Sequence, residues 1–90
     1  MLISKELNAA INEQIGNEFG AMLQYVGIAT YFDGEALPRL AAHFYRQAEE
    51  EKDHAMRLVH YVVEAGGTVA IPAIPAGRWV GRDPVYDREY

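Results

Sequence analysis

The chain has 90 residues, half of them apolar, a net charge of −5 and no cysteine. This length allows one small domain, and the lack of cysteine excludes a disulfide scaffold, a thiolate zinc site and an iron–sulfur cluster. The acidic balance favours cations as ligands and argues against nucleic acid as a partner. No run reaches the roughly 18 apolar residues of a membrane span, and the first residues lack the features of a signal peptide, so we expect a cytoplasmic protein that does not contact membranes.

The first predicted helix begins after Ser4, a good N-cap residue, with Glu6 in its first turn. Its apolar positions recur at alternating spacings of four and three residues, the pattern of a helix with one buried face. This stripe contains one carboxylate and comprises Ile11, Ile15, Glu18, Met22, Tyr25, Ala29 and Phe32. The pattern then breaks, and we predict that Gly34 is a left-handed C-cap.

The second predicted helix begins near Pro38, which suits a first helical turn, and ends at the glycine pair 66–67. Its stripe again contains one carboxylate and comprises Leu40, Phe44, Ala48, Glu51, Ala55, Leu58, Val62 and Ala65. Gln47, His54 and Tyr61 form a row beside that stripe, seven residues apart.

Two long helices joined by a connection of about four residues pack antiparallel, so residues 1–67 are predicted to form an all-α hairpin. Glu18 lies 16 residues before Gly34 and Glu51 lies 17 after it, which places both at the same height above the turn. His54 follows Glu51 by one turn on nearly the same face. Residues 68–90 hold three of the four prolines and are predicted to form an extended, irregular C-terminal tail.

Each of these three polar residues alone would be an ordinary solvated side chain, but together they have the pattern of a metal site. One Glu and a Glu-x-x-His motif from a facing helix are the ligands of di-iron and di-manganese carboxylate bundles. Two hairpins related by two-fold symmetry would form a four-helix bundle that contains two copies each of Glu18, Glu51 and His54. The four carboxylates would neutralise two divalent ions shared between the chains, and this ligand set suits iron or manganese.

Residues 1–75 resemble the first half of a bacterial non-haem ferritin. The stretches that carry the resemblance are 12–19, Tyr25, 48–58 and 61–67. The resemblance implies that Glu18, Glu51 and His54 are ferroxidase ligands, that Glu50 is an accessory carboxylate, and that Tyr25 lies beside the centre. It also implies that Fe(II) is oxidised to Fe(III) by dioxygen or peroxide, for iron storage or detoxification.

A ferritin chain has four long helices and a short fifth, so the remaining ligands of a ferritin centre are missing from these 90 residues. A closer analogue is the encapsulated ferritins, which are two-helix chains that build a di-iron site between subunits and use a separate protein shell for storage. We therefore expect a homo-oligomer with an even number of chains, placed inside such a shell. Residues 82–90 do not resemble a shell-targeting peptide.

Two alternatives remain open at this stage. A rubrerythrin-like di-iron peroxidase or oxidase would need an external reductase, because no cysteine is present for a rubredoxin module. A non-catalytic helical scaffold, or half-ferritin, would have to tolerate the carboxylates without a metal. The remaining residues have other assignments. Tyr25 has either a packing role or a catalytic, redox role beside the centre, and Gln47 a hydrogen bond to a ligand. We expect no metal at His43 or His60, and docking of the tail through Trp79, Tyr86 and Tyr90.

Overall fold

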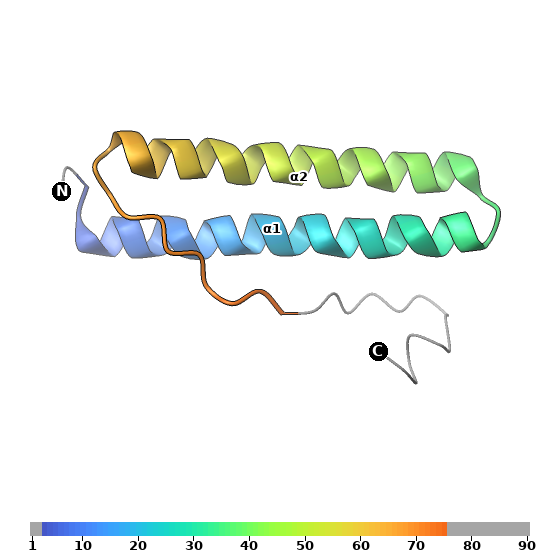
Figure 1. Ribbon diagram of the computed structural model, residues 1–90, viewed down its shortest axis with the longest axis horizontal. Helices are drawn as coiled ribbons and strands as arrows, with labels where there is room; N and C mark the ends of the chain where they lie inside the picture. The colour runs from blue at the N-terminus through green and yellow to red at the C-terminus, as the bar shows by residue number, and fades with distance from the viewer. Residues whose placement is uncertain (1–2, 76–90) are drawn as a thin grey trace.

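The computed structural model describes residues 3–75, which form two antiparallel α-helices. Helix α1 spans Lys5–Gly34 and helix α2 spans Pro38–Glu64, and the two lie side by side over their whole length (Figure 1). The Cα atoms extend 49 × 26 × 11 Å, so the molecule is about one helix thick. The predicted all-α hairpin is confirmed, and its dimerisation stays a prediction. Within residues 3–75, neither helix is apolar enough over a sufficient length to cross a bilayer.

The ends of the helices follow from local hydrogen bonding. The hydroxyl of Ser4 accepts a hydrogen bond from the backbone N–H of Leu7 at 3.0 Å, which confirms the predicted N-cap. Pro38 occupies the first turn of α2, as expected. At the end of α2, Gly66 adopts a φ of 78°. The N–H groups of residues 66 and 67 donate hydrogen bonds to the carbonyls of Val63 and Val62 in the last turn. This left-handed glycine stops the helix where the sequence predicted.

The end of α1 differs from the prediction that Gly34 is a left-handed C-cap. Gly34 is the last helical residue, and the positive φ falls two residues later, at Ala36, with a value of 58°. The N–H of Leu37 donates to the carbonyl of Phe32 at 2.9 Å, and the N–H of Ala36 donates to Asp33 at 3.1 Å. These two bonds satisfy terminal carbonyls and so compensate the roughly 1–2 kcal/mol that a left-handed alanine costs. Pairing of the last carbonyls, rather than the position of the glycine, decides where α1 ends.

The interface between the helices is narrow and consists mainly of small side chains. Ala29, Ala41, Ala48, Ala55, Ile15 and Val62 are its buried apolar residues. Other members of the predicted stripes, among them Met22, Tyr25 and Phe44, are only half-buried, and Leu40 is 43% exposed. Members of both stripes are therefore buried between the helices, including Ile15, Ala48 and Val62, whereas Met22, Tyr25, Phe44 and Leu40 form a partly exposed rim. A single layer of two helices leaves this rim open within the described residues.

Residues 68–75 turn back from the end of α2 and run along α1 (Figure 1). The backbone N–H of Thr68 donates to the side chain of Asn8 at 3.0 Å. The side chain of Asn12 donates to the carbonyl of Thr68 at 2.8 Å and accepts from the N–H of Ala70 at 2.7 Å. Two asparagines on α1 thus bind the start of this segment. The predicted docking residues Trp79, Tyr86 and Tyr90 lie outside the described residues.

Candidate metal centre

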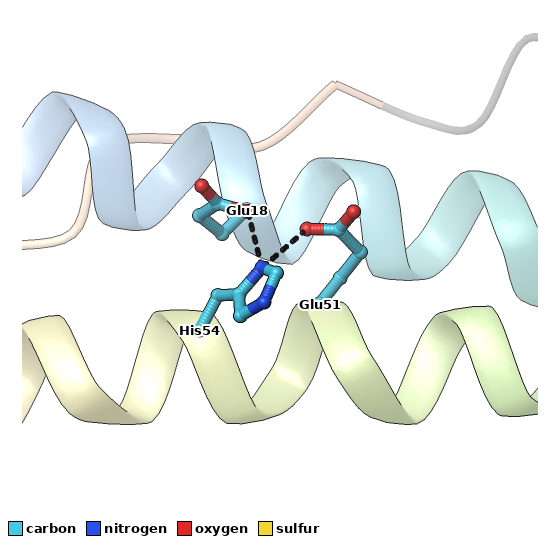
Figure 2. A group of neighbouring side chains, drawn as sticks. All are labelled: Glu18, Glu51 and His54. Atoms are coloured by element: carbon cyan, nitrogen blue, oxygen red, sulfur yellow. Dashed lines mark ion pairs between the residues drawn. The ribbon is translucent and has the colours of Figure 1, made fainter.

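Three side chains from the two helices meet near the middle of the hairpin (Figure 2). Glu18 comes from α1, and Glu51 and His54 come from α2, and their nearest ligand atoms all lie within 4.8 Å of one another. The Nδ1 atom of His54 lies 3.6 Å from Oε1 of Glu18 and 3.4 Å from Oε1 of Glu51. The sequence register predicted that these three side chains converge, and they do.

The helical interface explains how the three groups come so close. Glu51 and His54 are separated by three residues and therefore project from the same side of α2. The neighbouring interface residues Ala48 and Ala55 are 5% and 0% exposed, and their small side chains let the backbones approach. Glu18 can therefore reach across from α1 without being displaced by a bulky neighbour.

The two carboxyl groups interact and shift each other's pKa values in opposite directions. The pKa of Glu51 is raised, because it donates a hydrogen bond to Glu18 in its protonated form and lies beside that negative charge. The pKa of Glu18 is lowered, because its carboxylate accepts hydrogen bonds from Glu51 and from Gln14. Both glutamate side chains are 20% exposed, whereas that of His54 is 46% exposed. A cation at this position would take the place of the proton that Glu51 carries in its protonated form.

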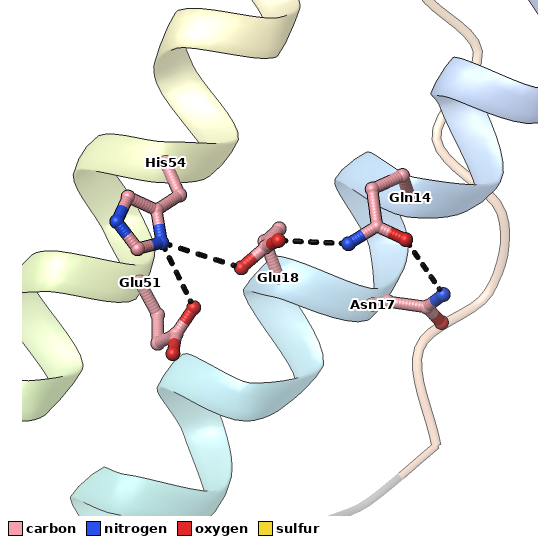
Figure 3. Close-up of polar contacts among 5 residues, drawn as sticks. All are labelled: Gln14, Asn17, Glu18, Glu51 and His54. Carbon is pink, nitrogen blue, oxygen red and sulfur yellow. Dashed lines mark hydrogen bonds and ion pairs between the residues drawn. The ribbon is translucent and has the colours of Figure 1, made fainter.

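Two amide side chains extend the cluster along α1 (Figure 3). The Nε2 group of Gln14 donates to Oε2 of Glu18 at 2.8 Å. The Nδ2 group of Asn17 donates to Oε1 of Gln14 at 3.3 Å. Neither residue was predicted to have a role from its sequence position. The spacing of four residues between Gln14 and Glu18 is the signal that could have indicated this contact, because such pairs face each other on a helix.

The other predicted residues lie outside the three-residue cluster. Glu50 is exposed, and the half-buried Gln47 lies near the interface. The ring of Tyr25 stacks on that of Phe44, with the ring centroids 6.0 Å apart. Within residues 3–75, the structure therefore shows Tyr25 in aromatic packing. His43 packs edge-on against Phe44 at 4.9 Å. The roles of Tyr25 and Glu50 at a metal centre remain predictions.

The donor set suits a divalent transition metal. Two carboxylates and one imidazole are ligands that iron and manganese accept, and three groups within 4.8 Å can surround one ion. Three ligands leave coordination positions open. The cluster therefore has the composition of half of a centre built from four glutamates and two histidines.

A hairpin with a Glu on one helix and a Glu-x-x-His motif on the next has the ligand pattern found in each half of a di-iron or di-manganese carboxylate bundle. A family model described as a ferritin-like domain matches residues 8–85. The chain belongs to the ferritin-like family, which confirms the resemblance seen in the sequence.

Individual ferritins are also similar to the chain in sequence. The chain is 51% identical over 73 residues to ferritin BfrB of Mycobacterium tuberculosis, covering 81% of this chain and 40% of that protein. It is 49% identical over 72 residues to ferritin BfrB of Mycolicibacterium smegmatis, covering 80% of this chain and 40% of that protein. It is 35% identical over 75 residues to a bacterial non-heme ferritin of Staphylococcus epidermidis, covering 83% and 45%. The chain thus spans less than half the length of these curated relatives.

Proposed function

We propose that this chain oxidises Fe(II) to Fe(III) at a di-iron site formed between two copies of the chain, for iron storage or detoxification. The observation that carries the proposal is the meeting of Glu18, Glu51 and His54 at one height in the hairpin. Family membership supports iron as the metal, and the ligand chemistry also allows manganese. The activity of ferritins belongs to proteins more than twice as long, so here it is a proposal.

The second copy is needed because the described hairpin offers only half of a four-helix bundle. Its open rim carries half-buried and exposed apolar residues of the same two stripes that contain the carboxylates, including Tyr25, Phe44 and Leu40. Two-fold pairing of these rims would bury the apolar residues and bring two three-residue clusters together. Four glutamates then carry about −4, which two divalent ions cancel. The resulting assembly contains an even number of chains.

Two irons at one site match the number of electrons that the oxidation requires. Each Fe(II) gives up one electron on oxidation, and dioxygen takes two electrons and two protons to become hydrogen peroxide. The task of the chain is to hold both ions close together with Glu18, Glu51 and His54 and to leave positions open for the oxidant. A proton on Glu51 must leave before this carboxylate binds a cation, so metal binding strengthens as the pH rises through the raised pKa of Glu51. Location in the cytoplasm, inside a protein shell, is part of the same proposal.

Rapid-mixing absorbance of Fe(II) oxidation in air tests the activity. The wild-type chain should oxidise Fe(II) faster than buffer alone, and Glu51→Gln should reduce the rate to near the buffer level. Glu49→Gln is the matched control, because it removes the same charge from an exposed position on the same helix. Equal rates for the wild type and Glu51→Gln would refute a ferroxidase at this cluster.

Native mass spectrometry tests the shared site. We expect pairs of chains that hold about one metal ion per chain. A folded monomer, or a dimer without bound metal, would instead support the non-catalytic scaffold. Oxidation that requires peroxide and an added reductase would favour the rubrerythrin-like alternative.

A further inference from the structure

The two oxygen atoms of Glu18 have different partners. Oε2 accepts a hydrogen bond of 2.8 Å from the side-chain amide of Gln14, one turn earlier on α1. Oε1 lies on the other side of the carboxylate, 3.6 Å from Nδ1 of His54 (Figure 3). One oxygen is therefore held by the helix that carries it, and the other faces the cluster.

The orientation of the Gln14 amide is fixed from both ends. An ionised carboxylate only accepts hydrogen bonds, so the NH₂ group of Gln14 must face Glu18. The carbonyl oxygen of the same amide accepts a hydrogen bond of 3.3 Å from Nδ2 of Asn17. A flipped Gln14 would lose both contacts, because it would oppose oxygen to oxygen at one end and NH₂ to NH₂ at the other. Asn17, Gln14 and Glu18 thus form a short directional chain along α1.

We infer that Gln14 is a positioning residue that makes Glu18 bind a metal ion through Oε1 alone. Turning the carboxylate to place both oxygens on one cation would bend or break the hydrogen bond between Gln14 and Oε2, so binding through Oε1 alone is favoured. Glu18 then occupies one coordination position instead of two, which keeps another position free. This inference rests on the proposed metal site, and it concerns how that site is shaped.

The expected size of the effect follows from groups that hold metal ligands in other proteins. Loss of such a partner typically lowers metal affinity by about 10–100-fold. The side chain of Gln14 is exposed, and methionine has nearly the same length and a similar helix propensity. Gln14→Met should therefore remove the hydrogen bond while leaving the hairpin folded.

The test is anaerobic titration of the full chain with Co²⁺, whose visible bands report coordination number and geometry. Gln14→Met should weaken Co²⁺ binding by about 10–100-fold and change the bands, with an unchanged unfolding midpoint in chelator. Asn17→Asp is a second variant. Its carboxylate would attract the NH₂ group of Gln14 and turn the amide away from Glu18, so it should change the bands in the same direction.

Two results would overturn the inference: bands and affinity that match the wild type, or weaker binding with unchanged bands, which indicates general destabilisation. Glu18→Gln separates this inference from the proposed site. If Glu18→Gln abolishes Co²⁺ binding and Gln14→Met has no effect, the metal site stands and the role of Gln14 is wrong. If Glu18→Gln binds Co²⁺ like the wild type, both are wrong.

Discussion

Asn12 and Thr68 are 56 residues apart in the sequence, yet the side-chain amide of Asn12 donates to the carbonyl of Thr68 at 2.8 Å. The same side chain accepts a hydrogen bond from the N–H of Ala70. Asn12 is 5% exposed and lies in the same helix as Glu18. The segment that follows α2 is therefore tied to the helix that contributes the first carboxylate.

Replacing Asn12 with leucine should destabilise the hairpin by about 1–3 kcal/mol, because the N–H of Ala70 loses its acceptor and the carbonyl of Thr68 keeps only the donor from Asn8. Urea unfolding followed by circular dichroism measures this change. Hydrogen exchange at the N–H of Ala70 should become faster in the variant. Asn17→Ala is the control, since Asn17 is exposed and, within residues 3–75, hydrogen-bonds to Gln14 of its own helix. Equal stability of both variants would mean that the amide contacts contribute little.

Glycines of α1 should respond differently to alanine. A Cβ at Gly34 would meet nothing within 4 Å, so Gly34→Ala should stabilise the helix by a few tenths to about 1 kcal/mol. A Cβ at Gly16 would lie 2.9 Å from Cγ of Pro72 and must displace the segment. Gly20 is intermediate, because its Cβ would contact Ile74 at 3.7 Å. From highest to lowest, the expected order of unfolding midpoints is Gly34→Ala, Gly20→Ala and Gly16→Ala.

A different order would contradict the placement of residues 72–74 against α1. Limited proteolysis gives an independent reading of the same contact. Cleavage within residues 68–75 should accelerate in Gly16→Ala and stay unchanged in Gly34→Ala.

The opposite pKa shifts of the two glutamates predict how stability without metal depends on pH. The pKa of Glu51 lies above its ordinary value of 4.5, so the stabilisation from its protonated form is complete below 4.5 and is lost as pH rises through the raised value. Glu51→Gln stays neutral and keeps a donor toward Glu18. In chelator, the variant should unfold at a higher temperature than the wild type near neutral pH, with the difference shrinking in acid.

Thermal unfolding at several values between about pH 4 and 8 checks this prediction. The lowered pKa of Glu18 acts in the opposite sense, because its contribution is present above 4.5 and is lost as pH falls through the lowered value. Glu49→Gln should follow the wild-type curve. If Glu51→Gln also follows that curve, the two carboxyl groups do not interact in solution.

Bound metal should stabilise the wild type but not a variant that lacks one of the metal ligands. A ligand that binds only the folded state at about 100 times its dissociation constant stabilises that state by about 2.7 kcal/mol. Anaerobic Fe(II) or Co²⁺ should therefore raise the unfolding midpoint of the wild type and leave that of His54→Ala unchanged. Sedimentation should show that metal also shifts the wild type toward paired chains. If the unfolding midpoint of the wild type does not change when metal is added, the proposed metal site is wrong.

Much of the fold and the cluster could be predicted from the sequence, because helical periodicity and antiparallel packing obey simple arithmetic. Equal distances of Glu18 and Glu51 from the turn placed both carboxylates at one height, and His54 followed by one helical turn. The prediction at Gly34 was wrong, because hydrogen bonding of the last carbonyls, not the residue type alone, selects the left-handed position. Gln14 was missed because an exposed amide has many equivalent rotamers until a neighbour selects one.

The sequence by itself determined the two helices, their register and the meeting of Glu18, Glu51 and His54. These features depend on local spacing along each helix and on one short turn. Only the tertiary structure decided that residues 68–75 bind to Asn8 and Asn12 on α1. Such contacts depend on which side chains come within about 3 Å after packing, and spacing along the chain does not specify that.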